Sequence, residues 1–177
     1  MSDLTVQDLA SPLTELGERL TGQDIEGEIY VAGGVAMLVA FRRGGFPREI
    51  DEVFVPQADI DREVAAMASD HKDLEPDWLN ARVLSMLPRG VDADQLQVLG
   101  GPGLTVNVAS AKWLLAMKAR AARGRRDLDD LWVLCQVLNL RLVDEVIAIC
   151  DEVWGEGMLR EDVIDLVTSD LRARGLR

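Results

Sequence analysis

The chain has 177 residues, with 31 acidic and 19 basic side chains, one histidine and a formal net charge of −12. Hydrophobic residues make up 48% of the sequence, which is enough for a folded core and excludes a mainly disordered chain. The acidic balance argues against a protein that wraps nucleic acid over its whole surface, although a local basic patch remains compatible with it. No apolar run reaches the roughly 18 residues needed to span a bilayer, and the N-terminus lacks a signal-peptide pattern. We therefore expect a cytoplasmic protein that is not associated with a membrane.

The first half of the chain alternates between helical and strand-like patterns. Runs rich in β-branched residues predict strands over 28–32 and 49–55. Apolar residues at helical spacing predict helices over 4–20, 35–41 and 59–68.

The second half begins with a predicted β-hairpin. Its strands are 96–99 and 104–108, and the turn between them is Gly100-Gly101-Pro102-Gly103. From residue 110 onward all patterns are helical, and the last two predicted helices are 141–153 and 159–173.

This order of elements predicts an α+β fold, in which a small mixed β-sheet flanked by helices is followed by a helical C-terminal region. We expect a core over 1–110, which includes the N-terminal helix, and a helical subdomain over 111–177 packed on it. The segment 74–88 shows no clear pattern and is left unassigned.

The two cysteines, Cys135 and Cys150, both lie in apolar helical patterns, so we expect free, buried thiols in a reducing compartment. No cluster of cysteine and histidine is present, which argues against a zinc site. The single histidine, His71, lies in a charged stretch, and we do not expect it to be catalytic.

A Gly33-Gly34 pair stands between a predicted strand and a predicted helix. Glycine allows a tight turn and lets backbone N–H groups approach an anion, and the start of the helix adds free N–H donors. The arrangement is typical of phosphate binding. It is also found where glycine serves only packing, and the chain has neither the P-loop lysine nor the three-glycine dinucleotide pattern.

Two acidic residues, Glu49 and Asp51, are two apart on the next predicted strand, so their side chains project from the same face. Neighbouring carboxylates repel one another unless a cation lies between them, and Mg²⁺ prefers such oxygen ligands together with substrate phosphates. The alternative is a solvated edge strand with its charges in water.

A dense basic cluster follows near the start of the helical region. It begins at Lys118, continues through four arginines, and ends at Asp127, Asp129 and Asp130. Basic side chains of this kind neutralise a triphosphate or a nucleic-acid backbone. The alternative is an exposed helix end with internal Arg–Asp pairs, in which Asp127 caps a new helix after Gly124.

Taken in this order, the three features resemble the nucleotidyltransferase superfamily with the DNA-polymerase-β-type fold. The resemblance is strongest to small bacterial members of the minimal-nucleotidyltransferase and abortive-infection-toxin kind. Those proteins carry a Gly-Gly turn before a helix, an Arg-x-Thr-x-Asp-x-Asp stretch, a Lys-x-x-Ala element and an Arg-Asp-x-x-Asp element. The matching segments fall between about 28 and 135: 30–36, 47–56, 77–80, 114–121 and 126–131.

The resemblance implies Mg²⁺-dependent transfer of a nucleoside monophosphate from a nucleoside triphosphate to a hydroxyl group. It assigns metal binding to Glu49 and Asp51, and catalysis to these two acids and Lys118. The residues that it assigns to nucleotide binding are Gly33, Gly34, Arg48, Lys118 and Arg126. Asn107, Asp127 and Asp130 would have supporting roles. The acceptor is not readable from the sequence: RNA such as tRNA, a protein hydroxyl, a small molecule and an antibiotic are all candidates. The oligomeric state is left open.

The chain departs from the family pattern at three positions. Glu49 stands where the first aspartate is usual, Pro47 replaces a threonine, and the polar face of 104–108 offers Thr105 and Asn107 but no third acid. Asn107 is a candidate neutral ligand at that position. These departures favour an alternative, a nucleotidyltransferase fold with a degraded site that acts as a binding module, such as one component of a toxin–antitoxin pair. A third alternative is a helical scaffold in which the matches arose by chance.

Overall fold

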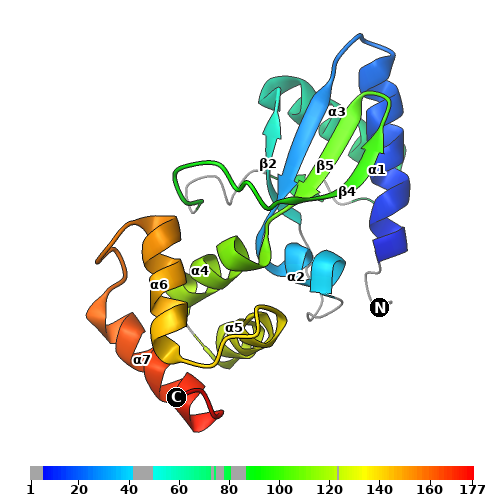
Figure 1. The fold of residues 1–177 in the computed structure, drawn as a ribbon. Helices are drawn as coiled ribbons and strands as arrows, with labels where there is room; N and C mark the ends of the chain where they lie inside the picture. Colours follow the sequence, from blue (N-terminus) through cyan, green and yellow to red (C-terminus); the bar gives the residue numbers. More distant parts are fainter. Residues whose placement is uncertain (1–5, 42–49, 73, 75–77, 81–86, 123) are drawn as a thin grey trace. The chain divides into compact units, whose positions relative to one another are not determined.

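A computed structural model describes the chain except for residues 1–5, 42–49, 73, 75–77, 81–86 and 123 (Figure 1). The chain divides into two compact units. The first comprises Met1–Ser85 and Asp94–Ala109, and the second comprises Met86–Ala93 and Ser110–Arg177. The sequence predicted a boundary between residues 110 and 111. In the structure the second unit begins at residue 110 and also contains the segment that precedes the hairpin.

The first unit is built on a mixed β-sheet. Within the described residues the strand order is β3-β2-β1-β5-β4. The pairs β1–β2 and β4–β5 are antiparallel, whereas β1–β5 and β2–β3 are parallel. The strand bounds are Gly27–Val31 for β1, Ile50–Val55 for β2, Leu79–Asn80 for β3, Leu96–Gly101 for β4 and Leu104–Val108 for β5. The predicted small mixed sheet and the predicted hairpin are both confirmed, while β3 lies in the segment that the sequence left unassigned.

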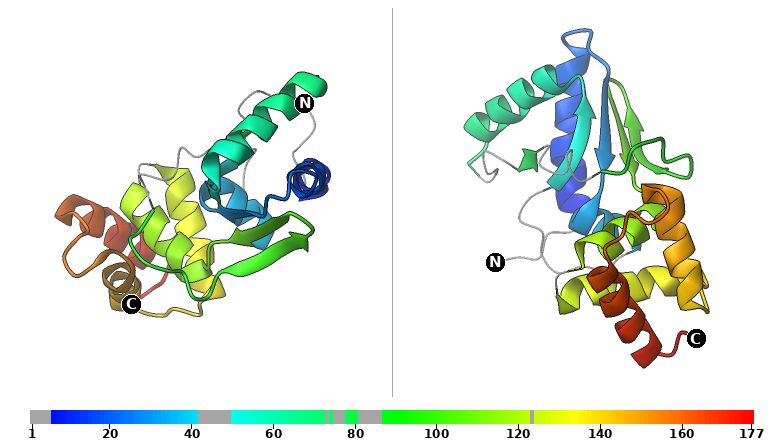
Figure 2. Two further views of the ribbon diagram at one scale, coloured as in Figure 1. Left: turned by 90° about the horizontal axis from the view of Figure 1, so that it is seen from above. Right: turned by 90° about the vertical axis from the view of Figure 1, so that its left-hand side faces the viewer.

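Among its described residues, the same unit contains three helices: α1 (Val6–Thr21), α2 (Gly33–Phe41) and α3 (Gln57–Asp70). Helices α1 and α3 contact each other and cover one face of the sheet (Figure 2). That face is apolar because alternate strand residues, such as Ile29 and Val106, point into it and are completely or almost completely buried. Each such aliphatic side chain stabilises the fold by about 1.5–3 kcal/mol.

The hairpin turn lies against helix α1 with almost no space between them. A Cβ atom on Gly17 of the helix would lie 2.9 Å from the carbonyl oxygen of Pro102 in the turn. Gly103 has a φ of +72°, which disfavours residues with a side chain, and its carbonyl accepts a 2.8 Å hydrogen bond from the Gly27 N–H. Glycines at 17 and 103 therefore allow the helix and the turn to approach closely.

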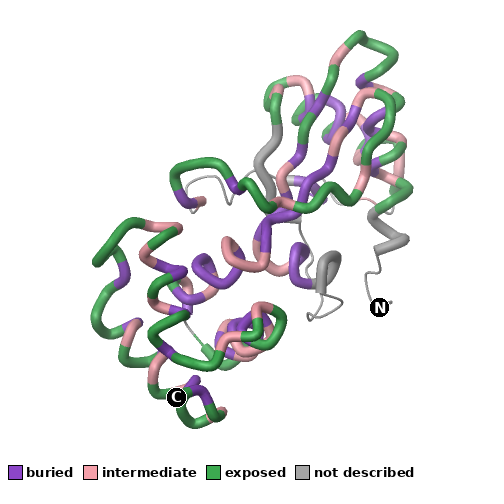
Figure 3. The backbone as a smooth tube through the Cα atoms, in the orientation of Figure 1, coloured by how far each residue is buried: buried purple, intermediate pink, exposed green. Residues whose placement is uncertain are grey.

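The second unit contains four helices among its described residues: α4 (Ala111–Ala121), α5 (Arg125–Val137), α6 (Val143–Trp154) and α7 (Glu161–Ala173). Helix α4 begins at an N-cap, Ser110, whose hydroxyl accepts a 3.3 Å hydrogen bond from the Trp113 N–H. Most of the buried residues of these helices, purple in Figure 3, are apolar. The predicted helical C-terminal region is therefore confirmed.

One local prediction for this unit is wrong. Asp127 does not cap α5, because the N-cap position is held by Gly124 and the aspartate lies in the first helical turn. In that position a carboxylate still interacts favourably with the helix dipole.

Among the described residues, no helix combines the length and apolar character that a membrane crossing requires.

Candidate functional site

The Gly-Gly turn has the predicted form. Strand β1 ends at Val31, and helix α2 begins at Gly33 after one buried residue, Ala32. Gly33 has a φ of +72°, and a Cβ atom built on it would meet nothing within 4 Å. The backbone conformation, and not the available space, therefore favours glycine here. The turn leaves the first N–H groups of α2 without partners inside the helix.

The backbone of Asp51 lies at the same edge of the sheet as this turn. Val31 pairs with Glu52 on β2, and Asp51 is the next residue toward the start of β2. One edge of the sheet therefore contains the last residues of β1 and β5 and the first residues of β2. At this edge the Ala109 N–H also donates a 2.9 Å hydrogen bond to the Val31 carbonyl. The predicted partners of Asp51, Glu49 and Arg48, lie outside the described residues.

Asn107 lies one strand further away, on β5, and pairs in register with Tyr30 of β1. Its side chain is buried, and its Nδ2 atom donates a 2.8 Å hydrogen bond to Oε1 of Glu28. Since β1 separates β5 from β2, an entire strand lies between Asn107 and Asp51.

Lys118 of the second unit is held by two carboxylates from α5. Its Nζ atom lies 2.8 Å from Oδ2 of Asp130 and 3.3 Å from Oδ1 of Asp127. The side chains of Lys118 and Asp130 are only 12% and 5% exposed. The two aspartates are three residues apart and so lie on one side of the helix. The structure thus brings together Lys118, Asp127 and Asp130, three of the predicted site residues. Arg126, a further predicted site residue, is exposed at the start of α5.

The predicted site residues are distributed over both units. The two glycines, Asp51 and Asn107 belong to the first unit, and Lys118 with the α5 residues belongs to the second. No group of three or more His, Cys, Asp or Glu side chains suited to a metal ion occurs in the described part of the chain, which does not include Glu49.

Asn80 is a residue at this edge to which the sequence reasoning assigned no role. It lies on β3 and pairs in register with Asp51. The only sequence signal was that 77–80 belongs to the segments that resemble the family, because a strand of two residues has no hydrophobic periodicity of its own.

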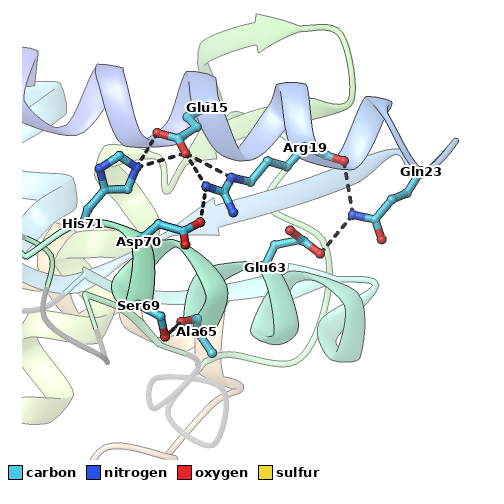
Figure 4. A network of polar contacts seen from close by, with 8 residues as sticks. All are labelled: Glu15, Arg19, Gln23, Glu63, Ala65, Ser69, Asp70 and His71. Carbon is cyan, nitrogen blue, oxygen red and sulfur yellow. Dashed lines mark hydrogen bonds and ion pairs between the residues drawn. The ribbon is translucent and has the colours of Figure 1, made fainter.

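A polar network links α1 and α3 on the surface of the first unit (Figure 4). Glu15 accepts hydrogen bonds from His71, at 3.1 Å, and from Arg19, at 2.7 Å, and Arg19 also pairs with Asp70 at 2.8 Å. The contact with His71 first, and that with Arg19 second, hold the pKa of the Glu15 carboxyl below its usual range. The single histidine thus takes part in a helix–helix contact.

The two cysteines are free and buried, as predicted. Burial raises the pKa of the Cys135 thiol to about 11 and that of the Cys150 thiol to about 12. Both thiols therefore stay protonated and unreactive at neutral pH.

Comparisons of the chain with models of known families, with curated proteins and with solved structures give no match.

Proposed function

We propose that the chain is a nucleotidyltransferase that transfers a nucleoside monophosphate from a nucleoside triphosphate to a hydroxyl group. The observation that carries the proposal is the pairing of β1 with β2, by which the backbone of Asp51 lies at the same sheet edge as the Gly33 turn. The residue that would supply a carboxylate to a metal ion and the backbone donors for phosphates are then close together in the fold, and phosphoryl transfer uses both kinds of group.

The acidic residues that the sequence supplies for this site suit Mg²⁺. Asp51 and Glu49 carry carboxylate groups, whose oxygens are the ligands that this hard cation prefers. A bound Mg²⁺ would neutralise phosphate charge and lower the pKa of the acceptor hydroxyl. The two acids would hold the cation, and the N–H groups of the Gly33-Gly34 turn would donate hydrogen bonds to the outer phosphates.

In the reaction, the acceptor oxygen forms a bond with the α-phosphorus, the bond from that phosphorus to the pyrophosphate oxygen breaks, and the hydroxyl proton leaves to solvent. The family resemblance assigns Lys118 and Arg126 to the negative charge that grows on the pyrophosphate. The Lys118 amine contacts both Asp127 and Asp130, at 3.3 Å and 2.8 Å, so these two carboxylates limit its movement.

The test is incorporation of labelled nucleotide into candidate acceptors in the presence of Mg²⁺, together with calorimetry of triphosphate binding. We expect Asp51→Asn and Glu49→Gln each to reduce incorporation by about 10²-fold or more. Asp61→Asn is the matched control, since Asp61 is an exposed acid on α3 of the same unit. Absence of Mg²⁺-dependent triphosphate binding by the unmodified protein would overturn the proposal.

A second candidate is a binding module with the same fold, such as one component of a toxin–antitoxin pair. It is favoured by Asn107, which stands at the expected position of a third acid and whose amide is hydrogen-bonded to Glu28. The calorimetry separates the two candidates, because a module with a degraded site binds a macromolecular partner without binding Mg²⁺ and triphosphate.

A further inference from the structure

Strand β4 forms one edge of the sheet in the first unit. Within the described residues its sole strand neighbour is β5, since β4 stands last in the order β3-β2-β1-β5-β4. Five of its six residues are exposed, and the sixth, Leu99, is half-buried. An edge strand presents a row of backbone N–H and C=O groups with which a further strand can pair. The outer side of β4 is therefore a template for strand addition.

The strand lacks the features by which edge strands usually avoid such pairing, which are charged side chains, proline and short length. The strand at the other end of the described sheet, β3, has only two residues, whereas β4 has six, and none of the six is charged or a proline. Charged residues make up 28% of the whole chain, so this exposed strand differs from the average of the sequence. It also exposes two large apolar side chains, Leu96 at 50% and Val98 at 45%.

An irregularity at Val98 affects which partner suits the strand. Gln97 pairs with Asn107 and Leu99 pairs with Val106, so Val98 lies between them without a partner residue on β5. A bulge of this kind bends a strand and increases its twist. A second strand that pairs along β4 has to follow the same bend and twist, and an identical strand has both.

We propose that β4 is the pairing surface of a homodimer, in which it binds in antiparallel order to β4 of a second copy of this chain. A two-fold symmetric contact uses the same patch on both copies, so the backbone donors and acceptors of each strand meet those of the other. The inference does not depend on the proposed function, because β4 supplies none of the residues assigned to nucleotide transfer.

The charges of the chain favour a second copy over a basic partner. A protein with a net charge of −12 would meet a basic partner through acidic side chains, and β4 has none. The acid nearest in sequence, Asp94, lies before the start of the strand. Antiparallel order keeps the two Asp94 residues roughly 25 Å apart, which is well beyond the Debye length of about 8 Å. Two acidic copies can therefore meet along a strand where neither carries a charge.

The experiment measures the oligomeric state of the full chain by analytical ultracentrifugation over a dilution series. A two-fold axis near the middle of β4 sets Val98 of one copy close to Val98 of the other. We expect Val98→Lys to weaken dimerisation by about tenfold or more, because two like charges then face each other. Val137→Lys is the matched control, since Val137 lies on α5 of the second unit and is 44% exposed, against 45% for Val98.

A mixing experiment separates a lost contact from a damaged fold. Val98→Glu alone should also be monomeric, whereas an equimolar mixture of the Val98→Lys and Val98→Glu variants should form a heterodimer, because opposite charges then meet. Hydrogen exchange gives a second readout, since the backbone amides of β4 in the unmodified protein should exchange more slowly as its concentration rises.

Three results would overturn the inference. The first is an unmodified protein that stays monomeric at every concentration, which includes the case in which β4 pairs only with a strand of another protein. The second is a dimer that Val98→Lys leaves as stable as Val137→Lys does, because the copies then meet through another surface. The third is a mixture of the two Val98 variants that remains monomeric.

Discussion

Removing the charge of Asp130 tests whether burial makes its contact with Lys118 stronger than the contact between Asp127 and Lys118. The Asp130 side chain is 5% exposed and lies 2.8 Å from Nζ of Lys118, which is itself 12% exposed. Breaking a buried ion pair costs about 3–5 kcal/mol, because one charge remains buried without its partner. Asp127 still binds the amine at 3.3 Å, so we expect Asp130→Asn to lower the free energy of unfolding by a smaller amount, about 2–3 kcal/mol.

Two matched variants calibrate this value. Asp127 is more exposed, at 19%, and more distant from the amine, so Asp127→Asn should cost less than about 1 kcal/mol. In the double variant Lys118→Met/Asp130→Leu, both buried charges are replaced by apolar groups of similar size, and most of the lost stability should return. With the single variants Lys118→Met and Asp130→Leu, the double variant completes a double-mutant cycle that gives the coupling energy of the pair.

Urea unfolding followed by tryptophan fluorescence is a suitable assay. Three of the four tryptophans, Trp113, Trp132 and Trp154, lie on helices of the second unit, so the signal reports mainly on that unit. The expected loss of stability shifts the midpoint by roughly 1–2 M urea. Equal midpoints for Asp130→Asn and Asp127→Asn would refute the argument that burial makes the Asp130 contact the dominant one.

Three further predictions concern other parts of the chain. Gly17→Ala should lower the melting temperature, although alanine has the higher helix propensity, because the alanine Cβ atom would clash with the Pro102 carbonyl oxygen. An unchanged or higher melting temperature would contradict the close packing of α1 against the hairpin turn. Glu15→Gln should destabilise the protein slightly at pH 7, because the lowered pKa of the Glu15 carboxyl contributes stability above the usual carboxyl pKa of 4.5. This contribution is lost as the pH falls through the lowered pKa of the folded state, so the substitution should have no effect at still lower pH. A loss of stability that does not vary with pH contradicts this. Cys135 and Cys150 should react with iodoacetamide at pH 8 only after the protein is unfolded, and mass spectrometry would detect the labelled thiols. Rapid labelling of the native protein would contradict the burial of the two thiols.

The hydrophobic pattern of the sequence determined most of the elements. Helices α6 and α7 begin and end within two residues of their predicted bounds, and β1 and β5 match closely, because apolar periodicity is a local property that burial enforces. The Gly33 turn was also predictable, since a positive φ between a strand and a helix is a local demand for glycine.

Pairing between distant segments could be decided only by the tertiary structure. Asp51 pairs in register with Asn80, whereas Asn107 lies on β5 beyond β1, because sheet order and register depend on contacts between residues far apart in the chain. The short strand β3 has no pattern of its own and exists only through its pairing with β2. Asp127 resembled a helix cap in the sequence, yet Gly124 holds the N-cap of α5 and the Asp127 carboxylate contacts Lys118 of α4, a contact that depends on how the two helices pack.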